Sequence, residues 1–151
     1  DVLVNNAGVG KYAPVTQLTV EDWDWMLSVN LRGPFLCSRA VLKPMLAAGR
    51  GHIVNVSSVL GTTTIPHAAA YCASKWGLMA LTEVLQKEVG PHGIRVTALC
   101  PGLVKTHFGG RPPEAKAGGL EPEDVAKAAL DLVTHHPRAL PSVVILRPAA
   151  R

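Results

Sequence analysis

Short apolar runs alternate with longer stretches of helical composition along this chain. Apolar and β-branched residues fill positions 1–5, 51–58, 94–100 and 142–146, and in each run they occupy both odd and even positions. Successive side chains of a strand point to opposite faces of its sheet, so such runs suit strands that are covered on both faces. The pattern therefore predicts four buried strands.

The stretches between these strands predict three helices. Thr19 precedes Asp22 by three residues, which is the spacing of a helix-capping box. Gly33, Pro34 and Pro44 are expected to kink the helix that follows, or to divide it into two segments. The predicted helices span about residues 20–48, 69–89 and 122–135.

Strands that are separated by helices of ten or more residues form βα units, which pack into a parallel sheet. The sequence therefore predicts an α/β fold in which a doubly wound parallel sheet carries helices on both faces. Residues 1–151 contain no internal repeat and no break in composition, so we expect them to belong to one domain. Residues 106–119 are rich in Gly and Pro and are predicted to form a flexible loop.

The composition excludes several classes of protein. With 48% hydrophobic and 17% charged residues the chain is expected to fold around an apolar core, and no run is long and apolar enough for a membrane span. A formal charge of +4 without clustered Lys or Arg does not indicate nucleic-acid binding. Cys37, Cys72 and Cys100 form no CxxC pair, and His135-His136 fits a solvated helix end, so neither a disulfide framework nor a metal site is expected. These features favour a cytoplasmic protein.

Tyr71 and Lys75 carry the most informative chemistry. They lie four residues apart on a predicted helix, so their side chains share one face, although an exposed pair at this spacing is also common. An ammonium group beside a phenol lowers the pKa of the tyrosine, which would make Tyr71 a general acid/base. Ser58 stands thirteen residues earlier, at the carboxyl end of a predicted strand, where parallel sheets bind ligands. Its hydroxyl is expected to hold a substrate oxygen.

Neighbouring residues leave alternatives open. Ser57 is the other candidate serine, but alternation along the strand turns it to the opposite face, and the spacing favours Ser58. His67, in the loop before the second helix, either contacts substrate or is an ordinary loop residue. Cys72 is expected to be a small buried hydrophobic residue, and Ser74 a supporting or cofactor-proximal contact.

Taken with the motifs around it, this set resembles the short-chain dehydrogenase/reductase family. The resemblance runs in order and in spacing from residue 1 to about residue 106, and more loosely to the end. The motifs that carry it are Asn5-Asn6-Ala7-Gly8, Asn30, Ser58, Tyr71 with Lys75, and Pro101-Gly102-Leu103-Val104-Lys105-Thr106. Several motifs in register are far more specific than any one alone.

The resemblance implies a role for each catalytic position. Tyr71 would be the acid/base, and Lys75 would bind the nicotinamide ribose and lower the pKa of Tyr71. Ser58 would hydrogen-bond the substrate oxygen, and Asn30 would hold a water that links Lys75 to solvent. Hydride would pass between a nicotinamide cofactor and a carbinol carbon while Tyr71 moves the proton.

The resemblance also implies an NAD(P) cofactor. The residues that it assigns to cofactor binding are Asn6, Ala7, Gly8, Tyr71, Lys75, Pro101, Gly102, Val104 and Thr106. The C-terminal segment lacks the family's usual Gly-Gly and is similar to the branch of NADP-dependent 3-hydroxy acid dehydrogenases, which favours NADP over NAD.

The chain departs from the family at its beginning. The Gly-rich dinucleotide fingerprint and the residue that selects the ribose 2′ group are absent, and Asp1 coincides with the start of the family's fourth strand. We therefore expect residues 1–151 to be the C-terminal part of one Rossmann-type NAD(P)-binding domain, truncated by roughly 75–90 residues.

The predicted function is interconversion of a secondary alcohol or hydroxy acid and its carbonyl. Two alternatives stay open, namely a non-catalytic dinucleotide-binding or redox-sensing module, and a fragment that is inactive by itself. The expected partner is a small-molecule alcohol or carbonyl. In this family the helices at about 20–48 and 69–89 form a dimer interface, so a homodimer or homotetramer is expected, with Trp23 and Trp25 as packing or interface residues.

Overall fold

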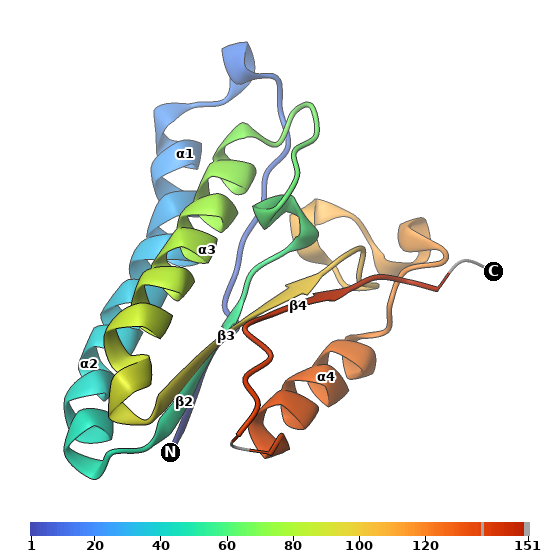
Figure 1. Ribbon diagram of the computed structural model, residues 1–151. Coiled ribbons are helices and arrows are strands. Elements are labelled where there is room, and N and C mark those ends of the chain that lie inside the picture. The colour runs from blue at the N-terminus through green and yellow to red at the C-terminus, as the bar shows by residue number, and fades with distance from the viewer. Residues whose placement is uncertain (137, 150–151) are drawn as a thin grey trace.

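Four strands form one parallel sheet in the computed structural model, which describes residues 1–136 and 138–149 (Figure 1). Each strand pairs with its neighbour in chain order, so every connection is a crossover. The strands are β1 (Val2–Asn5), β2 (Gly51–Val56), β3 (Ile94–Pro101) and β4 (Val143–Leu146). The α/β fold with a parallel sheet is confirmed, and β2 ends two residues earlier than predicted. The predicted burial of all four strands is wrong for the two outer ones, since Val2 and Val4 of β1 and Val143 and Ile145 of β4 are exposed on one face of this structure.

Helices cover both faces of this sheet. In Figure 1, α1 (Val20–Leu27), α2 (Gly33–Ala48) and α3 (Ala69–Val89) lie on one side, and α4 (Pro122–Thr134) lies on the other. The Thr19 hydroxyl accepts a hydrogen bond from the Asp22 amide at 3.1 Å, as the capping pattern predicts. None of the helices in the described part of the chain combines the length and apolar content of a membrane-spanning helix.

The helical stretch 20–48 is divided into two segments, as predicted, but the division lies before Pro34 and not at Pro44. A π-helical turn, Ser28–Arg32, separates α1 from α2, and the Gly33 amide donates to the Ser28 carbonyl five residues back. Pro34 occupies the first turn of α2, where a missing amide leaves no intrahelical bond unmade. Pro44 neither ends nor divides the helix, since α2 continues through it to Ala48. The π turn carries Asn30, a predicted site residue.

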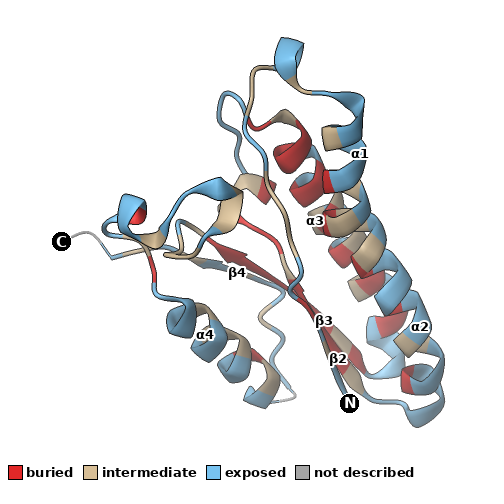
Figure 2. Ribbon diagram, turned by 180° about the vertical axis from the view of Figure 1, so that it is seen from behind, coloured by how far each residue is buried: buried red, intermediate tan, exposed pale blue. Residues whose placement is uncertain are grey.

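Two apolar layers hold the helices to the sheet. Ile53 and Val54 are adjacent on β2, fully buried, and directed to opposite faces. Figure 2 shows the buried residues concentrated in the central strands and on the inner side of α3. The layer beneath α2 and α3 contains Met45, Ile53, Leu85, Val89, Ile94 and Val96, and the layer beneath α4 contains Val54, Leu99 and Leu132.

A buried polar chain fixes the carboxyl ends of β1 and β2. Asn5 Nδ2 donates to Asn55 Oδ1 at 2.7 Å and to Ser38 Oγ at 3.3 Å, and Asn55 Nδ2 donates to Thr82 Oγ1 at 2.9 Å. Buried amides need such partners, because an unmade hydrogen bond in the interior is costly. These buried hydrogen bonds therefore tie both strands to α2 and α3 at the point where Asn6 leaves the sheet.

Residues 106–119 form a loop, as the sequence predicts, and its expected flexibility stays a prediction. They contain two 3₁₀ turns, Phe108–Gly110 and Pro113–Lys116, and Lys116 is buried. A parallel bridge between Val104 and Leu120 closes the base of the loop. The Gly and Pro content predicted turns in this segment, but it did not predict the burial of Lys116 or the bridge between Val104 and Leu120.

Candidate active site

The carboxyl edge of the parallel sheet brings the predicted residues together. Ser58 follows β2, and the segment Asn6–Gly8 follows β1. A β-carbon on Gly8 would lie 3.6 Å from Asn30 Oδ1 and 3.7 Å from Lys75 Nζ. The motif after β1, the π turn and the first turns of α3 therefore meet at one place, which is where open α/β sheets bind ligands.

Tyr71 and Lys75 lie one turn apart on α3, and both are buried. Lys75 Nζ stands 5.8 Å from the centroid of the Tyr71 ring and donates to the Val56 carbonyl at 2.9 Å. The exposed helical pair considered from the sequence is thus excluded. The ammonium faces the ring of Tyr71, and its hydrogen bond goes to the backbone at the end of β2.

Burial determines the protonation of this pair. It raises the pKa of Tyr71 above its ordinary value, hydrogen bonding to the Ser58 side chain opposes the rise, and Tyr12 and Cys72 add to it. The predicted lowering of the Tyr71 pKa by Lys75 is therefore not found in this structure. Desolvation also lowers the pKa of Lys75 to about 8. Spacing predicted the contact, but not the desolvation that dominates it.

Asn30 ties the loop after β1 to the start of α3. Its Oδ1 accepts from the Val9 amide at 2.8 Å, and its Nδ2 donates to the Val9 carbonyl at 2.9 Å and to Ser74 Oγ at 3.0 Å. Ser74 Oγ in turn donates to the Tyr71 carbonyl at 2.7 Å. Ser74 is thus a supporting residue, one of the two roles expected for it. The water relay expected of Asn30 stays a prediction.

The two adjacent serines have different surroundings. Ser57 Oγ donates to the Lys75 carbonyl at 3.3 Å and lies against Gly61, where an added β-carbon would approach it to 2.6 Å. Ser58 Oγ accepts from the Leu60 amide at 3.1 Å and is the hydroxyl that acts on the Tyr71 pKa. The geometry favours Ser58 as the serine beside Tyr71, as the spacing predicts. Cys72 is 6% exposed, which confirms its assignment as a buried residue.

The remaining predicted residues lie at the edges of the site. The Gly102 amide donates to the Leu146 carbonyl at 2.8 Å, so the turn after Pro101 is fixed against β4. Val104 forms the bridge to Leu120, and Thr106 Oγ1 accepts from the Phe108 amide at 3.3 Å. These contacts hold the segment in place and leave its cofactor role a prediction.

His67 contributes through its backbone. Its φ of +66° is a left-handed conformation that non-glycine residues rarely adopt, and its carbonyl accepts from the Ala13 amide at 2.8 Å. The side chain is exposed. The substrate contact considered for His67 stays a prediction, and the backbone contact joins the loops that follow β1 and β2.

Two aromatic residues at the site were missed by sequence reasoning. The ring of Phe108 meets Tyr71 edge-on with centroids 5.5 Å apart, and the ring of Tyr12 lies 6.0 Å from Tyr71 on centroids. Both stand in loops without periodicity, so no pattern distinguished them. The one signal was Gly10, since a β-carbon there would lie 2.7 Å from the Phe108 ring.

The Lys75 ammonium beside Gly8 suits the ribose hydroxyls of an NAD(P) cofactor. An ammonium has three N–H groups, and Lys75 gives one of them to Val56, so the others remain for the hydroxyls of a ribose. The missing side chain of Gly8 leaves space next to that ammonium. The described residues contain no cluster of three or more His, Cys, Asp or Glu that could hold a metal ion.

Comparisons with known proteins agree on one family. Residues 1–116 match the family model described as short chain dehydrogenase. D-threitol dehydrogenase of Mycolicibacterium smegmatis is 39% identical over 145 residues, covering 89% of this chain and 56% of that protein. Inactive 2-(S)-hydroxypropyl-CoM dehydrogenase 2 of Xanthobacter autotrophicus is 40% identical over 148 residues, covering 87% and 64%. The chain thus spans less than two thirds of the length of these relatives.

Solved structures give the same result. A metagenomic short-chain oxidoreductase in complex with NADP has a TM-score of 0.83 and 37% identity, over 100% of this chain and 62% of that chain. A 4-hydroxyisoleucine dehydrogenase complexed with NADH has a TM-score of 0.85 and 31% identity, over 97% of this chain and 66% of that chain. Structural neighbours thus bind NADP or NADH.

Proposed function

This chain belongs to the short-chain dehydrogenase/reductase family, and we propose that the whole protein is an NAD(P)-dependent oxidoreductase that interconverts a secondary alcohol or hydroxy acid and its carbonyl. The observation that supports this most is the convergence of Ser58, Tyr71 and Lys75 at the carboxyl edge of the sheet. Gly8 leaves space beside the Lys75 ammonium, and Asn30 holds the loop after β1 through its hydrogen bond from the Val9 amide.

The chain's own residues supply the proton and hold the substrate. A bound NAD(P) supplies or accepts the hydride. Ser58 donates a hydrogen bond to the substrate oxygen, and Tyr71 donates its proton to that oxygen as a carbonyl is reduced. Because burial keeps the pKa of Tyr71 high, the hydroxyl is protonated and ready to donate throughout the neutral pH range. Oxidation of an alcohol would require the deprotonated form of Tyr71 to accept the proton, and the raised pKa disfavours that form, so this structure favours the reduction direction.

The cofactor is held by Lys75 and by the segments after β1 and β3. Lys75 has donors for the ribose hydroxyls. The segment from Pro101 to Thr106, which is held in place by bonds such as that from the Gly102 amide to Leu146, is proposed to hold the nicotinamide, as the resemblance implies. We propose NADP or NAD as the cofactor, with NADP favoured by the resemblance of the C-terminal segment. A cytoplasmic location would fit the three unpaired cysteines, Cys37, Cys72 and Cys100.

Ser58→Ala tests the assignment of the serine. We expect kcat/KM for ketone reduction to fall about 10²-fold, because removing one hydrogen-bond donor to a developing oxyanion has effects of this size. Cofactor binding, followed by nicotinamide fluorescence, should stay unchanged. Ser57→Ala is the matched control and should keep most of the activity, since its hydroxyl bonds to the backbone. A larger loss in Ser57→Ala than in Ser58→Ala would reverse the assignment.

A non-catalytic dinucleotide-binding module is the second candidate, and one observation favours keeping it. The relative from Xanthobacter autotrophicus, at 40% identity, is named inactive. The two functions are separated by adding NADPH or NADH to the whole protein with a panel of ketones and aldehydes. Quenching or enhancement of nicotinamide fluorescence without oxidation of the cofactor would support the module, whereas substrate-dependent oxidation supports the enzyme.

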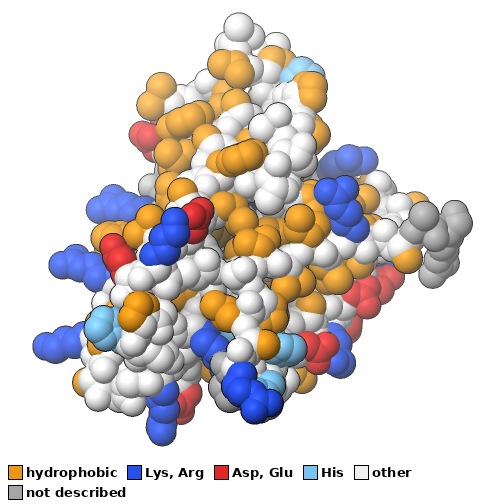
Figure 3. All heavy atoms as spheres, in the orientation of Figure 1, with side chains coloured by type: hydrophobic (Ala, Val, Ile, Leu, Met, Phe, Trp, Pro, Cys, Tyr) orange, Lys and Arg blue, Asp and Glu red, His pale blue; other side chains and the backbone are white. Residues whose placement is uncertain are grey.

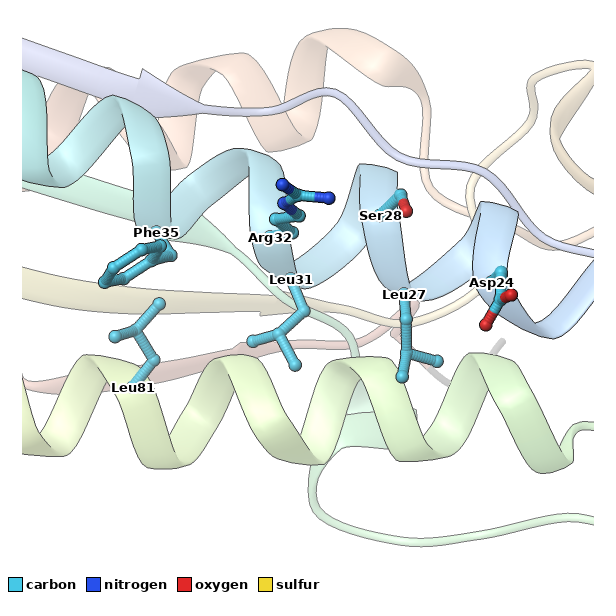
Figure 4. A pocket seen from close by; sticks show the side chains of 7 residues that line it. All are labelled: Asp24, Leu27, Ser28, Leu31, Arg32, Phe35 and Leu81. Carbon is cyan, nitrogen blue, oxygen red and sulfur yellow. The ribbon is translucent and has the colours of Figure 1, made fainter.

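We propose that a second copy of the chain packs on the outer face of α1, α2 and α3. Phe35, Trp23 and Trp25 are exposed there, so the tryptophans are not packed inside this chain. Apolar side chains gather in Figure 3 over the upper part of the molecule, where α1 and the start of α3 lie. Figure 4 shows a groove between these helices, with Leu27 and Leu31 projecting toward α3. It is lined by Asp24, Leu27, Ser28, Leu31, Arg32, Phe35 and Leu81.

Phe35→Asp is expected to convert the oligomer to a monomer in light scattering. Phe35 is 45% exposed, so a carboxylate there is tolerated in the free subunit but would be buried unpaired between two copies. Leu130→Asp, at an equally exposed apolar position on α4, should leave the mass unchanged. A wild-type protein that is monomeric at all concentrations would refute the proposed dimer.

A further inference from the structure

Lys116 is buried without a carboxylate partner. Its side chain ends the second 3₁₀ turn of the loop after β3, and the residue is 5% exposed. Nζ donates to the Thr106 carbonyl at 2.6 Å and to the Phe108 carbonyl at 2.8 Å, and no ion pair of Lys116 occurs in the described ranges. Lysine is rarely buried in this way, since desolvation of its charge is unfavourable. The two carbonyl oxygens therefore hold the ammonium in place, and the ammonium in turn holds the backbone of Thr106 and Phe108 together.

Those carbonyls belong to the turn that covers Tyr71. Phe108 meets the Tyr71 ring edge-on, and its ring occupies the space that a side chain on Gly10 would need. On the other side, Gly109 has a φ of +71° and leaves room for Tyr12, whose ring would lie 2.9 Å from a β-carbon there. Phe108 and Tyr12 thus form an aromatic cover over Tyr71.

Two backbone hydrogen bonds close the base of the loop. The Leu120 amide donates to the Leu103 carbonyl at 2.8 Å, and the Lys105 amide donates to the Leu120 carbonyl at 2.9 Å. Beyond this base, the two bonds from Lys116 join the second turn of the loop to the first. Lys116 therefore links the second turn of the loop to Phe108, the residue that covers Tyr71.

We propose that Lys116 is a positioning residue for the reaction, and that Phe108, which it holds over Tyr71, limits the size of the substrate. This rests on the proposed function, since it takes Tyr71 as the acid/base. With the rings of Phe108 and Tyr12 packed against Tyr71, a carbonyl with small substituents would approach its hydroxyl more readily than one with a bulky aromatic group. The bonds to Thr106 and Phe108 keep that limit constant from one turnover to the next.

Lys116→Met tests the positioning role, because it keeps the length of the side chain and removes both hydrogen bonds. In the whole protein, amide hydrogen exchange of Gly110 and Ala115, which bond within the two turns that Lys116 joins, should accelerate about tenfold or more, while exchange in β2 stays unchanged. Lys116→Arg, which keeps charged donors, should restore slow exchange. Lys127→Met, the same change at an exposed lysine of α4, is the control and should leave the loop unaffected. Unchanged loop exchange in Lys116→Met would overturn the positioning role.

Phe108→Ala tests the size limit. We expect the ratio of kcat/KM for an aryl ketone to that for a small methyl ketone to rise about tenfold, with Lys116→Met shifting it in the same direction. An unchanged ratio in both variants would overturn the proposal. Failure of the proposed function gives a different result, since then Tyr71→Phe would reduce both ketones as fast as the unmodified protein does.

Discussion

Tyr71→Phe is expected to lower kcat for carbonyl reduction about 10²- to 10⁴-fold, the range that general acid catalysis contributes. The substitution removes only a hydroxyl. The ring of Tyr71 stays packed among Met26, Phe108 and Tyr12, so the variant should fold as the unmodified protein does. The loss should appear mainly in kcat, because the missing proton is needed only in the chemical step, while Lys75 keeps its donors for the ribose of NAD(P)H.

The matched control for this variant is Tyr12→Phe. Tyr12 lies 6.0 Å from Tyr71 on ring centroids and is itself 41% exposed, so the same chemical change is made next to the site. We expect Tyr12→Phe to keep kcat within a few-fold, measured by the loss of NADPH absorbance with a saturating ketone. Near-normal turnover by Tyr71→Phe would contradict the acid/base assignment, whatever Tyr12→Phe does.

Local spacing was sufficient to predict the centre of the site. Tyr71 and Lys75 share a face because α3 is a regular helix there, and Ser58 lies nearby because it leaves the carboxyl end of β2. The first inference uses the spacing of side chains along one helix, and the second uses the fact that parallel strands end at the same edge of the sheet. The central strands β2 and β3 were predicted for the same reason, since burial on both faces leaves apolar residues at both parities, as in Ile53 and Val54. The same pattern in β1 and β4 did not reveal that these outer strands leave one face exposed.

Long-range packing explains what the sequence did not reveal. Lys116, Phe108 and Tyr12 lie in irregular segments, and they reach Tyr71 only when the loops after β1 and β3 close on each other. The upward shift of the Tyr71 pKa also comes from long-range packing. The spacing places an ammonium nearby, but only the assembled fold removes water from the hydroxyl. Resemblance assigned Asn30 to the site, yet its bonds to Val9 depend on a π turn that no residue pattern announced.

Lys75→Met is expected to remove activity and to stabilise the protein at neutral pH. Its ammonium lies next to Gly8 with N–H groups left for a ribose, and it is the cation nearest the Tyr71 ring in the described site. We expect kcat/KM to fall roughly 10²- to 10³-fold, as for other charged donors of preorganised sites, with weaker cofactor binding contributing. Titration with the cofactor, followed by nicotinamide fluorescence, measures how much of this loss comes from weaker cofactor binding.

The gain in stability follows from the burial of the charge. Lys75 has a pKa of about 8 in the fold and 10.5 in a solvated chain. Below pH 8 both states are protonated, so the folded protein carries the full desolvation penalty of roughly 3 kcal/mol, and stability rises as pH increases from about 8 to 10.5. Methionine avoids this penalty but leaves the Val56 carbonyl without its donor, a loss of about 1 kcal/mol.

Lys75→Met should therefore unfold with a free energy about 2 kcal/mol above that of the unmodified protein at pH 7, as measured by urea denaturation. The difference should shrink as pH rises from about 8 to 10.5, because the unmodified lysine is then neutral in the folded protein and no longer carries the desolvation penalty. Lys87→Met, at an exposed position of the same helix, should show no comparable gain. A variant that is less stable at pH 7, or a gain that does not change with pH, would show that Lys75 is retained for stability and not for its role beside Tyr71.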